Sequence, residues 1–80
     1  MPGTIHKLKV WTEFYVDLES GLKKFEIRIN DRDYKVGDYL LLCDYNKNTD
    51  EYSGKEIFKQ ITYIVEGFGL KDGYICLGIE

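Results

Sequence analysis

The stretch that decides the fold runs from residue 21 to residue 30 and reads GLKKFEIRIN. Its apolar residues, Phe25, Ile27 and Ile29, alternate with polar residues from position 24 to position 30. Because successive side chains of a strand point to opposite faces, this period of two predicts an amphipathic β-strand over residues 24–30. Gly21 suits the left-handed turn that ends many helices. The stretch therefore indicates a passage from a helix into a strand.

A short helix is predicted before this strand. Thr12 is a suitable N-cap, Glu13 complements the positive end of the helix dipole, and the apolar residues Phe14, Tyr15, Leu18 and Leu22 recur at spacings of three and four. Such a helix is too short to be stable alone, so we expect it to pack on a sheet. The alternating residues 7–10, which end at Trp11, predict a strand before the helix.

Three more strands are predicted after residue 30. Polar turns at 30–33 and 36–38 lead into the apolar run 39–43, which is typical of a strand covered on both faces. Residues 44–54 carry several turn-forming residues and are expected to be a surface loop or hairpin tip. The alternating segments 57–65 and 74–79 complete a set of five strands, and the first of them is long enough that we expect it to bend or to serve two sides of the sheet.

These elements predict a mainly β (α+β) fold: a small five- to six-stranded β-barrel with one short helix after the first strand. Closure of a barrel removes the exposed sheet edges that a small protein tolerates poorly. With 80 residues, of which 44% are hydrophobic, the chain is near the lower limit for one core. We therefore expect a single domain over residues 1–80.

Charge and cysteine content exclude several classes of function. Eleven basic residues against fourteen acidic ones argue against binding duplex nucleic acid by bulk charge neutralisation. Seven of the bases lie within residues 1–35, so an anion site is expected there. Cys43, Cys76 and the one histidine, His6, form no metal-binding or redox motif, so we expect reduced thiols, no metal and no cofactor. No apolar run is long enough to cross a bilayer and no secretion signal is evident, which predicts a cytoplasmic protein that does not bind membranes.

Charged side chains gather where the predicted helix passes into the strand. Glu26, Arg28 and Asn30 share one strand face, and Lys23 lies within reach of it. Arginine offers forked donors and glutamate accepts from the amino group of a base, so this group suits a phosphate or the polar edge of a base. The alternative is that the row is the solvated face of the strand, joined by weak surface ion pairs.

Other residues near this group could complete a binding site. Trp11, beside Lys9, is suited to stack on an unpaired base, and Arg32 in the following turn can reach a phosphate. The predicted binding residues are therefore Lys9, Trp11, Lys23, Glu26, Arg28, Asn30 and Arg32. RNA is favoured over DNA because a narrow cleft with weak overall charge suits single-stranded or modified bases. A protein partner, suggested by the acidic second half of the chain, is an open alternative.

The motif Gly21-x-Lys23-x-x-Glu26-x-Arg28 resembles the G-x-K-x-x-E-x-R signature of the ASCH domains. The likeness continues over residues 6–79, and within them the chain is similar to a small bacterial and phage branch of that superfamily, mostly domains of unknown function. The resemblance implies a PUA-like β-barrel with a cleft between the helix and the following strand, used for RNA or nucleotide binding. Members often have proline at the position of Thr12, and threonine or proline at that of Lys24.

The same resemblance implies a possible enzymatic activity. Some similar proteins are amidohydrolases that deacetylate acetylated cytidine with the signature lysine, a threonine or serine nucleophile and a distant glutamate. Carried over by position, Lys23 would be the base, with Glu26 as the second catalytic candidate. Glu26 occupies the position of the threonine, however, and an ionised carboxylate beside a lysine opposes its loss of a proton. Binding of RNA or a nucleotide, hydrolysis of a modified nucleoside, and protein interaction therefore remain three alternatives.

Overall fold

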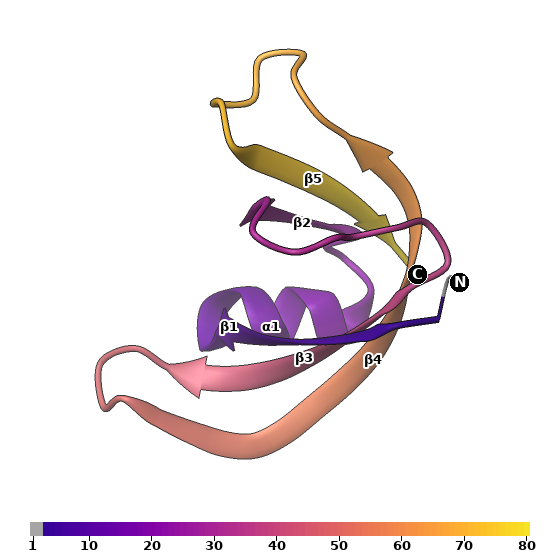
Figure 1. Cartoon of the computed structure of the whole chain (residues 1–80). Coiled ribbons are helices and arrows are strands. Elements are labelled where there is room, and N and C mark those ends of the chain that lie inside the picture. The colour runs from indigo at the N-terminus through magenta and orange to yellow at the C-terminus, as the bar shows by residue number, and fades with distance from the viewer. Residues whose placement is uncertain (1–2) are drawn as a thin grey trace.

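The computed structural model describes residues 3–80, in which one curved sheet wraps around one helix (Figure 1). The elements are β1 (Ile5–Trp11), α1 (Thr12–Ser20), β2 (Phe25–Ile29), β3 (Tyr39–Asn46), β4 (Glu51–Val65) and β5 (Tyr74–Ile79). The prediction of a mainly β fold with five strands, and with a single helix after the first strand, is confirmed within the described residues.

The sheet is open, so the expected closed barrel is wrong. Its strand order is β1-β3-β4-β5-β2, with β1 and β3 parallel and the other neighbours antiparallel. β4 pairs with β3 through residues 51–60 and with β5 through residues 61–65, which confirms that one long strand serves two sides of the sheet. Its bend carries the sheet around (Figure 1), but β1 and β2 remain the two edges and share no backbone ladder.

The loop expected over residues 44–54 is mostly strand. Tyr45 pairs with Tyr52 and Asn46 with Glu51, so only residues 47–50 turn between β3 and β4. The side-chain oxygen of Asn46 accepts from the backbone N–H groups of Asn48 and Thr49 at 2.9 and 3.3 Å. This local turn closes the hairpin within four residues, which a count of turn-forming residues does not predict.

Helix α1 packs its Tyr15 and Leu18 into the core that lines the inner face of the sheet. The other members of this core are Leu8, Val10, Tyr34, Leu40, Leu42, Ile61, Ile75, Leu77 and Ile79. Gly21 ends the helix at φ 83°, as predicted. Thr12 is not the N-cap: Trp11 precedes the helix without a side-chain cap, and the Thr12 hydroxyl instead donates to Asp44 at 2.7 Å. Asp44 is buried and also accepts a hydrogen bond from the Ser53 hydroxyl. Because a buried carboxylate requires hydrogen-bond donors, the Thr12 hydroxyl bonds Asp44 and does not cap the helix.

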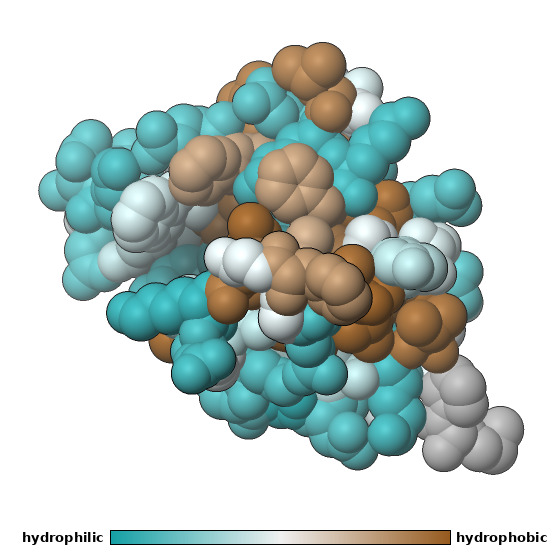
Figure 2. All heavy atoms as spheres, turned by 90° about the horizontal axis from the view of Figure 1, so that it is seen from above, coloured by the Kyte–Doolittle hydropathy of each residue, from teal (hydrophilic) through white to brown (hydrophobic). Residues whose placement is uncertain are grey.

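Strand β2 turns its polar row inward and its apolar row outward. Glu26 and Arg28 pair with Leu77 and Ile75 of β5, both buried, and so share the inner face with them. Glu26 is only 4% exposed, whereas the apolar residues Phe25, Ile27 and Ile29 are 44 to 57% exposed. Seen from above, from the side of β5 and β2, the surface shows apolar side chains between polar ones (Figure 2). The interpretation of the charged row as a solvated face is therefore wrong for Glu26, whereas Lys24 and Asn30 are exposed.

A buried carboxylate fixes the start of β1 to the start of β3. Asp38 is 1% exposed and accepts from His6 Nε2 at 2.8 Å and from the backbone N–H groups of Gly3, Thr4 and Lys35. Burial alone would raise the pKa of Asp38, but the bonds from His6 and these N–H groups outweigh it and hold that pKa below its ordinary value. Cys43 and Cys76 are both free thiols, as expected, and Cys43 is buried.

Candidate functional site

Two arginine side chains bridge the gap between the sheet edges β1 and β2, which we call the seam. Arg28 Nη1 donates to the carbonyl oxygen of Lys9 at 3.1 Å, and Arg32 Nη1 donates to that of Lys7 at 3.2 Å. Carbonyls of alternate residues in a strand point the same way, so these two face away from β3 and toward β2. Side chains thus replace the backbone ladder that would close a barrel.

A cavity of about 310 Å³, which we call the cleft, lies between the start of α1, the end of β1 and strand β2. It is lined by Lys9, Val10, Trp11, Phe14, Lys23, Glu26, Ile27 and Arg28. The helix supplies Phe14, the exit from the helix supplies Lys23, and the inward row of β2 supplies Glu26 and Arg28. The hollow lies between the helix and the following strand, where the sequence places the candidate site.

Three charged side chains converge in the cleft around Glu26. Lys23 Nζ lies 2.9 Å from Glu26 Oε1, and Arg28 Nη1 lies 3.7 Å from Glu26 Oε2. The Glu26 side chain is 5% exposed, whereas those of Lys23 and Arg28 are 19% and 29% exposed. A buried carboxylate is thus neutralised by two cations that keep contact with solvent, and the trio carries one net positive charge.

Aromatic rings form one wall of the cleft and hold Lys23. The rings of Trp11 and Phe14 stack with centroids 6.1 Å apart and an angle of 17° between their planes, and both side chains remain about half exposed. Lys23 Nζ lies 4.4 Å from the Phe14 ring centroid and 5.3 Å from that of Phe25, in reach of cation–π attraction. Lys47 Nζ lies 4.2 Å from the Trp11 ring centroid, so each ring of the wall also holds a lysine. The cleft therefore combines half-exposed aromatic rings with a charged floor.

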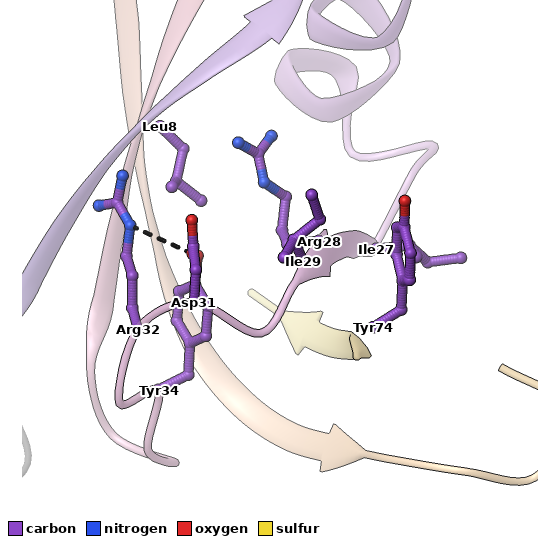
Figure 3. A pocket seen from close by; sticks show the side chains of 8 residues that line it. All are labelled: Leu8, Ile27, Arg28, Ile29, Asp31, Arg32, Tyr34 and Tyr74. Carbon is purple, nitrogen blue, oxygen red and sulfur yellow. Dashed lines mark ion pairs between the residues drawn. The ribbon is translucent and has the colours of Figure 1, made fainter. Parts of the chain in front are cut away.

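A second cavity of about 270 Å³, which we call the arginine cavity, lies on the other side of Arg28 (Figure 3). Its lining is Leu8, Ile27, Arg28, Ile29, Asp31, Arg32, Tyr34 and Tyr74, so it shares Ile27 and Arg28 with the cleft. Tyr34 is 7% exposed, and its hydroxyl has no hydrogen-bond partner among the described residues. Burial raises the pKa of Tyr34, against the opposing charges of Arg32 and Arg28 and the polar contact with the Arg28 guanidinium.

The predicted site residues fall into three groups. The cleft is lined by Lys9, Trp11, Lys23, Glu26 and Arg28, whereas Arg32 lines the arginine cavity. Asn30 lines neither, because its side-chain amide donates to Glu66 at 2.7 Å on the surface. Among the described residues, no group of three or more His, Cys, Asp or Glu side chains is arranged to hold a metal ion. Within residues 3–80, no helix has the length and hydropathy required to span a bilayer.

Sequence reasoning missed Phe14 and Tyr34. The helical spacing assigned Phe14 to the apolar face of α1. Only Tyr15 and Leu18 of that helix are buried, however, and Phe14 lines the cleft instead. Tyr34 lies in the irregular segment between β2 and β3, where no periodicity predicts the direction of a side chain. No signal in the sequence would have identified it.

Comparison with known proteins gives a family but no activity. Residues 5–79 match the family described as Domain of unknown function (DUF3850). This match covers nearly the whole chain, so the chain belongs to that family. No curated protein matches the sequence.

Proposed function

We propose that this member of the DUF3850 family binds a nucleotide, free or within single-stranded RNA, in the cleft, where Glu26 accepts from the base. The observation that carries the proposal is the buried carboxylate of Glu26 on the floor of an open cavity, between Lys23 at 2.9 Å and Arg28 at 3.7 Å. Buried ion pairs contribute little to stability compared with apolar residues of similar size. A functional role for this one is therefore the better explanation.

The charged floor offers both kinds of hydrogen-bonding group that a base edge requires. A carboxylate has about four acceptor positions, and Lys23 occupies one of those on Glu26, so the amino group of a base can still be accepted. The guanidinium of Arg28 has five N–H donors, of which the Lys9 carbonyl takes one. The others are available to a ring nitrogen or carbonyl of the same base. This pairing of donor and acceptor favours a nucleobase over a simple anion.

The aromatic wall supplies the second part of the recognition. A base that takes the place of the solvated Lys47 ammonium over Trp11 can stack on that ring, and stacking contributes about 1–3 kcal/mol per base in single-strand binding proteins. The cations Lys9, Lys23 and Arg28 line the same cavity, in a chain whose net charge is −3. A local positive site on a negatively charged protein suits one or a few nucleotides and disfavours a duplex.

We infer further that the family is related to the ASCH domains and that its open sheet corresponds to their PUA-like barrel. Support comes from the order of the elements, with one helix between β1 and β2, and from the placing of Lys23, Glu26 and Arg28 of the shared motif around one cavity. Gly21 of the motif has a separate role, as the left-handed end of α1. The seam marks the position where a closed barrel would have its last backbone ladder.

The geometry favours binding over hydrolysis of an acetylated nucleoside. Among residues 3–80, no serine, threonine or cysteine side chain lines the cleft, so these residues offer no hydroxyl or thiol nucleophile there for a covalent mechanism. Thr12 is next to Trp11 in the chain, but its hydroxyl donates to Asp44. Lys23 donates to Glu26, the position that holds a threonine in the similar hydrolases.

Isothermal titration calorimetry tests the proposal. The wild-type chain is titrated with the four ribonucleoside monophosphates and with single-stranded tetraribonucleotides, and compared with Glu26→Gln and with Glu51→Gln, an exposed control on the β3–β4 hairpin. We expect binding of at least one ligand by the wild type, at least ten-fold weaker binding by Glu26→Gln, and an unchanged affinity for the control. Absence of binding by the wild type, or equal binding by Glu26→Gln, would contradict the proposal. Release of acetate from acetylated cytidine would favour the hydrolase instead.

A further inference from the structure

We propose that the arginine cavity is a phosphate subsite, so that the ligand of the cleft is a nucleoside carrying a phosphate ester and not a free nucleoside. The inference rests on the proposed function of the cleft and extends it to a second cavity. The two cavities share Arg28, so a base in the cleft and a phosphate in the arginine cavity would lie on opposite sides of one guanidinium. Base and phosphate of one nucleotide could then both contact Arg28.

The guanidinium groups of Arg28 and Arg32 both line the arginine cavity and point toward β1, on either side of Leu8 (Figure 3). Arg28 and Arg32 donate to the carbonyls of Lys9 and Lys7, two residues apart on β1. Such carbonyls are separated by about 6.6 Å along a strand, so the two guanidinium groups lie at a similar spacing. A phosphate between them accepts from both, since each charge-assisted bond spans about 2.8 Å. Each guanidinium keeps four N–H donors beyond the one that bridges the seam.

The hydroxyl of Tyr34 is the independent sign of an absent ligand. Tyr34 is more than nine-tenths buried and lines the cavity beside the Arg28 guanidinium, yet its hydroxyl proton has no acceptor and its oxygen no well-aligned donor among the described residues. Buried polar groups are nearly always paired, and leaving one unpaired destabilises the fold, so an unpaired hydroxyl in a native cavity requires an explanation. A phosphate oxygen would accept its proton and complete the pairing.

One acidic group also lines the cavity. Asp31 Oδ1 lies 3.9 Å from Arg32 Nε, and its side chain is 64% exposed, so the pair is loose and screened by water. The polar residues of the lining are therefore two cations, two tyrosines and one solvated carboxylate. The balance is positive and suits a phosphate monoester or diester, the chemistry that free nucleotides and RNA share.

The test measures the contribution of the phosphate by itself. The four ribonucleosides, their 5′- and 3′-monophosphates and a tetraribonucleotide are titrated at fixed ionic strength against the wild type, Arg32→Met, Tyr34→Phe and Lys35→Met. Lys35 is an exposed control whose replacement removes the same charge outside both cavities. We expect the preferred monophosphate to bind at least ten-fold more tightly than its nucleoside. Arg32→Met and Tyr34→Phe should remove most of that gain and leave nucleoside affinity unchanged. Lys35→Met should change neither the gain nor the nucleoside affinity.

Thermal unfolding separates a ligand-binding role for Tyr34 from a structural one. Because the hydroxyl has no partner, Tyr34→Phe should unfold at the same or a higher temperature while it loses affinity for phosphate. Tighter binding of the tetranucleotide than of any mononucleotide would identify RNA as the source of the phosphate. Tighter binding of a mononucleotide would identify a free nucleotide as the source. Equal affinity for nucleoside and monophosphate, with Glu26→Gln still weakening both, would overturn the phosphate subsite and leave the proposed function intact. Absence of binding by all of these ligands would overturn both.

Discussion

The guanidinium of Arg28 donates at 3.1 Å to the backbone carbonyl of Lys9 and so joins the two edges of the sheet across the seam. The same guanidinium lies 3.7 Å from Glu26 and lines both cavities. One side chain therefore links the closure of the fold to the floor of the candidate site. Its replacement should affect stability and binding by different amounts.

Replacement of Arg28 by methionine should weaken binding strongly and stability slightly. The lost seam bond is exposed and Lys23, at 2.9 Å, still neutralises Glu26, so we expect the free energy of unfolding to fall by roughly 0.5–1.5 kcal/mol. Nucleotide affinity should fall more than ten-fold, because both cavities lose their shared donor. Urea denaturation and calorimetric titration measure the two effects. Lys55→Met, an exposed charge removal on β4, is the control, and an unchanged affinity for Arg28→Met would contradict the assignment.

The glycine of the motif should matter for stability and not for ligand contact. Gly21 adopts φ 83°, and an added Cβ would meet no atom within 4 Å, so alanine there is strained by backbone conformation alone. We expect Gly21→Ala to lower the free energy of unfolding by about 1 kcal/mol. Nucleotide affinity, measured well below the unfolding temperature, should stay within two-fold of the wild type. A loss of affinity without a loss of stability would show that Gly21 contacts the ligand.

Stability should decrease in acid through Asp38. The pKa of Asp38 is lower in the folded chain than in the unfolded chain, because the hydrogen bonds to its carboxylate outweigh burial. Its contribution is therefore present above the ordinary aspartate range, near pH 4, and is lost as the pH falls through the folded pKa. Asp38→Asn should cost roughly 2–4 kcal/mol at pH 7 and flatten the acid branch of the stability curve. Denaturant titrations from pH 7 to pH 2 measure both curves, and parallel acid branches would contradict this role.

The single tryptophan gives a direct optical signal of binding. Trp11 is the only tryptophan of the chain and lines the cleft at 45% exposure, so a base that stacks there should change its emission. Trp11→Ala should lower nucleotide affinity about 5- to 150-fold, which corresponds to about 1–3 kcal/mol of stacking. Phe58→Ala, an exposed aromatic of β4, is the matched control and should bind normally. Binding by Trp11→Ala at wild-type affinity would exclude stacking on this ring.

Local sequence patterns predicted the helix and the strands. They did not predict the features that depend on the pairing of distant strands. The end of the helix at Gly21 was predictable because it depends on the conformation of one residue. The double pairing of residues 57–65 was predictable from the length of that strand. Closure depends instead on whether β1 and β2 pair, and no local signal specifies the contact of two distant edges. The period of two in β2 groups Phe25, Ile27 and Ile29 on one face. It does not say which face is buried, and the register with β5 decides that.

The candidate site follows the same division. The spacing of Lys23, Glu26 and Arg28 predicted neighbours, and the structure places them around one cavity. Asn30 continues the row in sequence, but β2 ends at Ile29, so its side chain leaves the row and bonds Glu66. Tyr34 and the arginine cavity arise only when the irregular segment after β2 folds back beside the seam.

Mapping of the binding surface by nuclear magnetic resonance tests the central claim most directly. Backbone amide and tryptophan side-chain signals of the isotope-labelled chain are followed during titration with a ribonucleoside monophosphate. The account predicts saturable shifts that are largest at Trp11, Lys23, Glu26 and Arg28, and small at the β3–β4 turn over residues 47–50. Shifts centred away from the cleft, or no shifts at millimolar nucleotide, would contradict it.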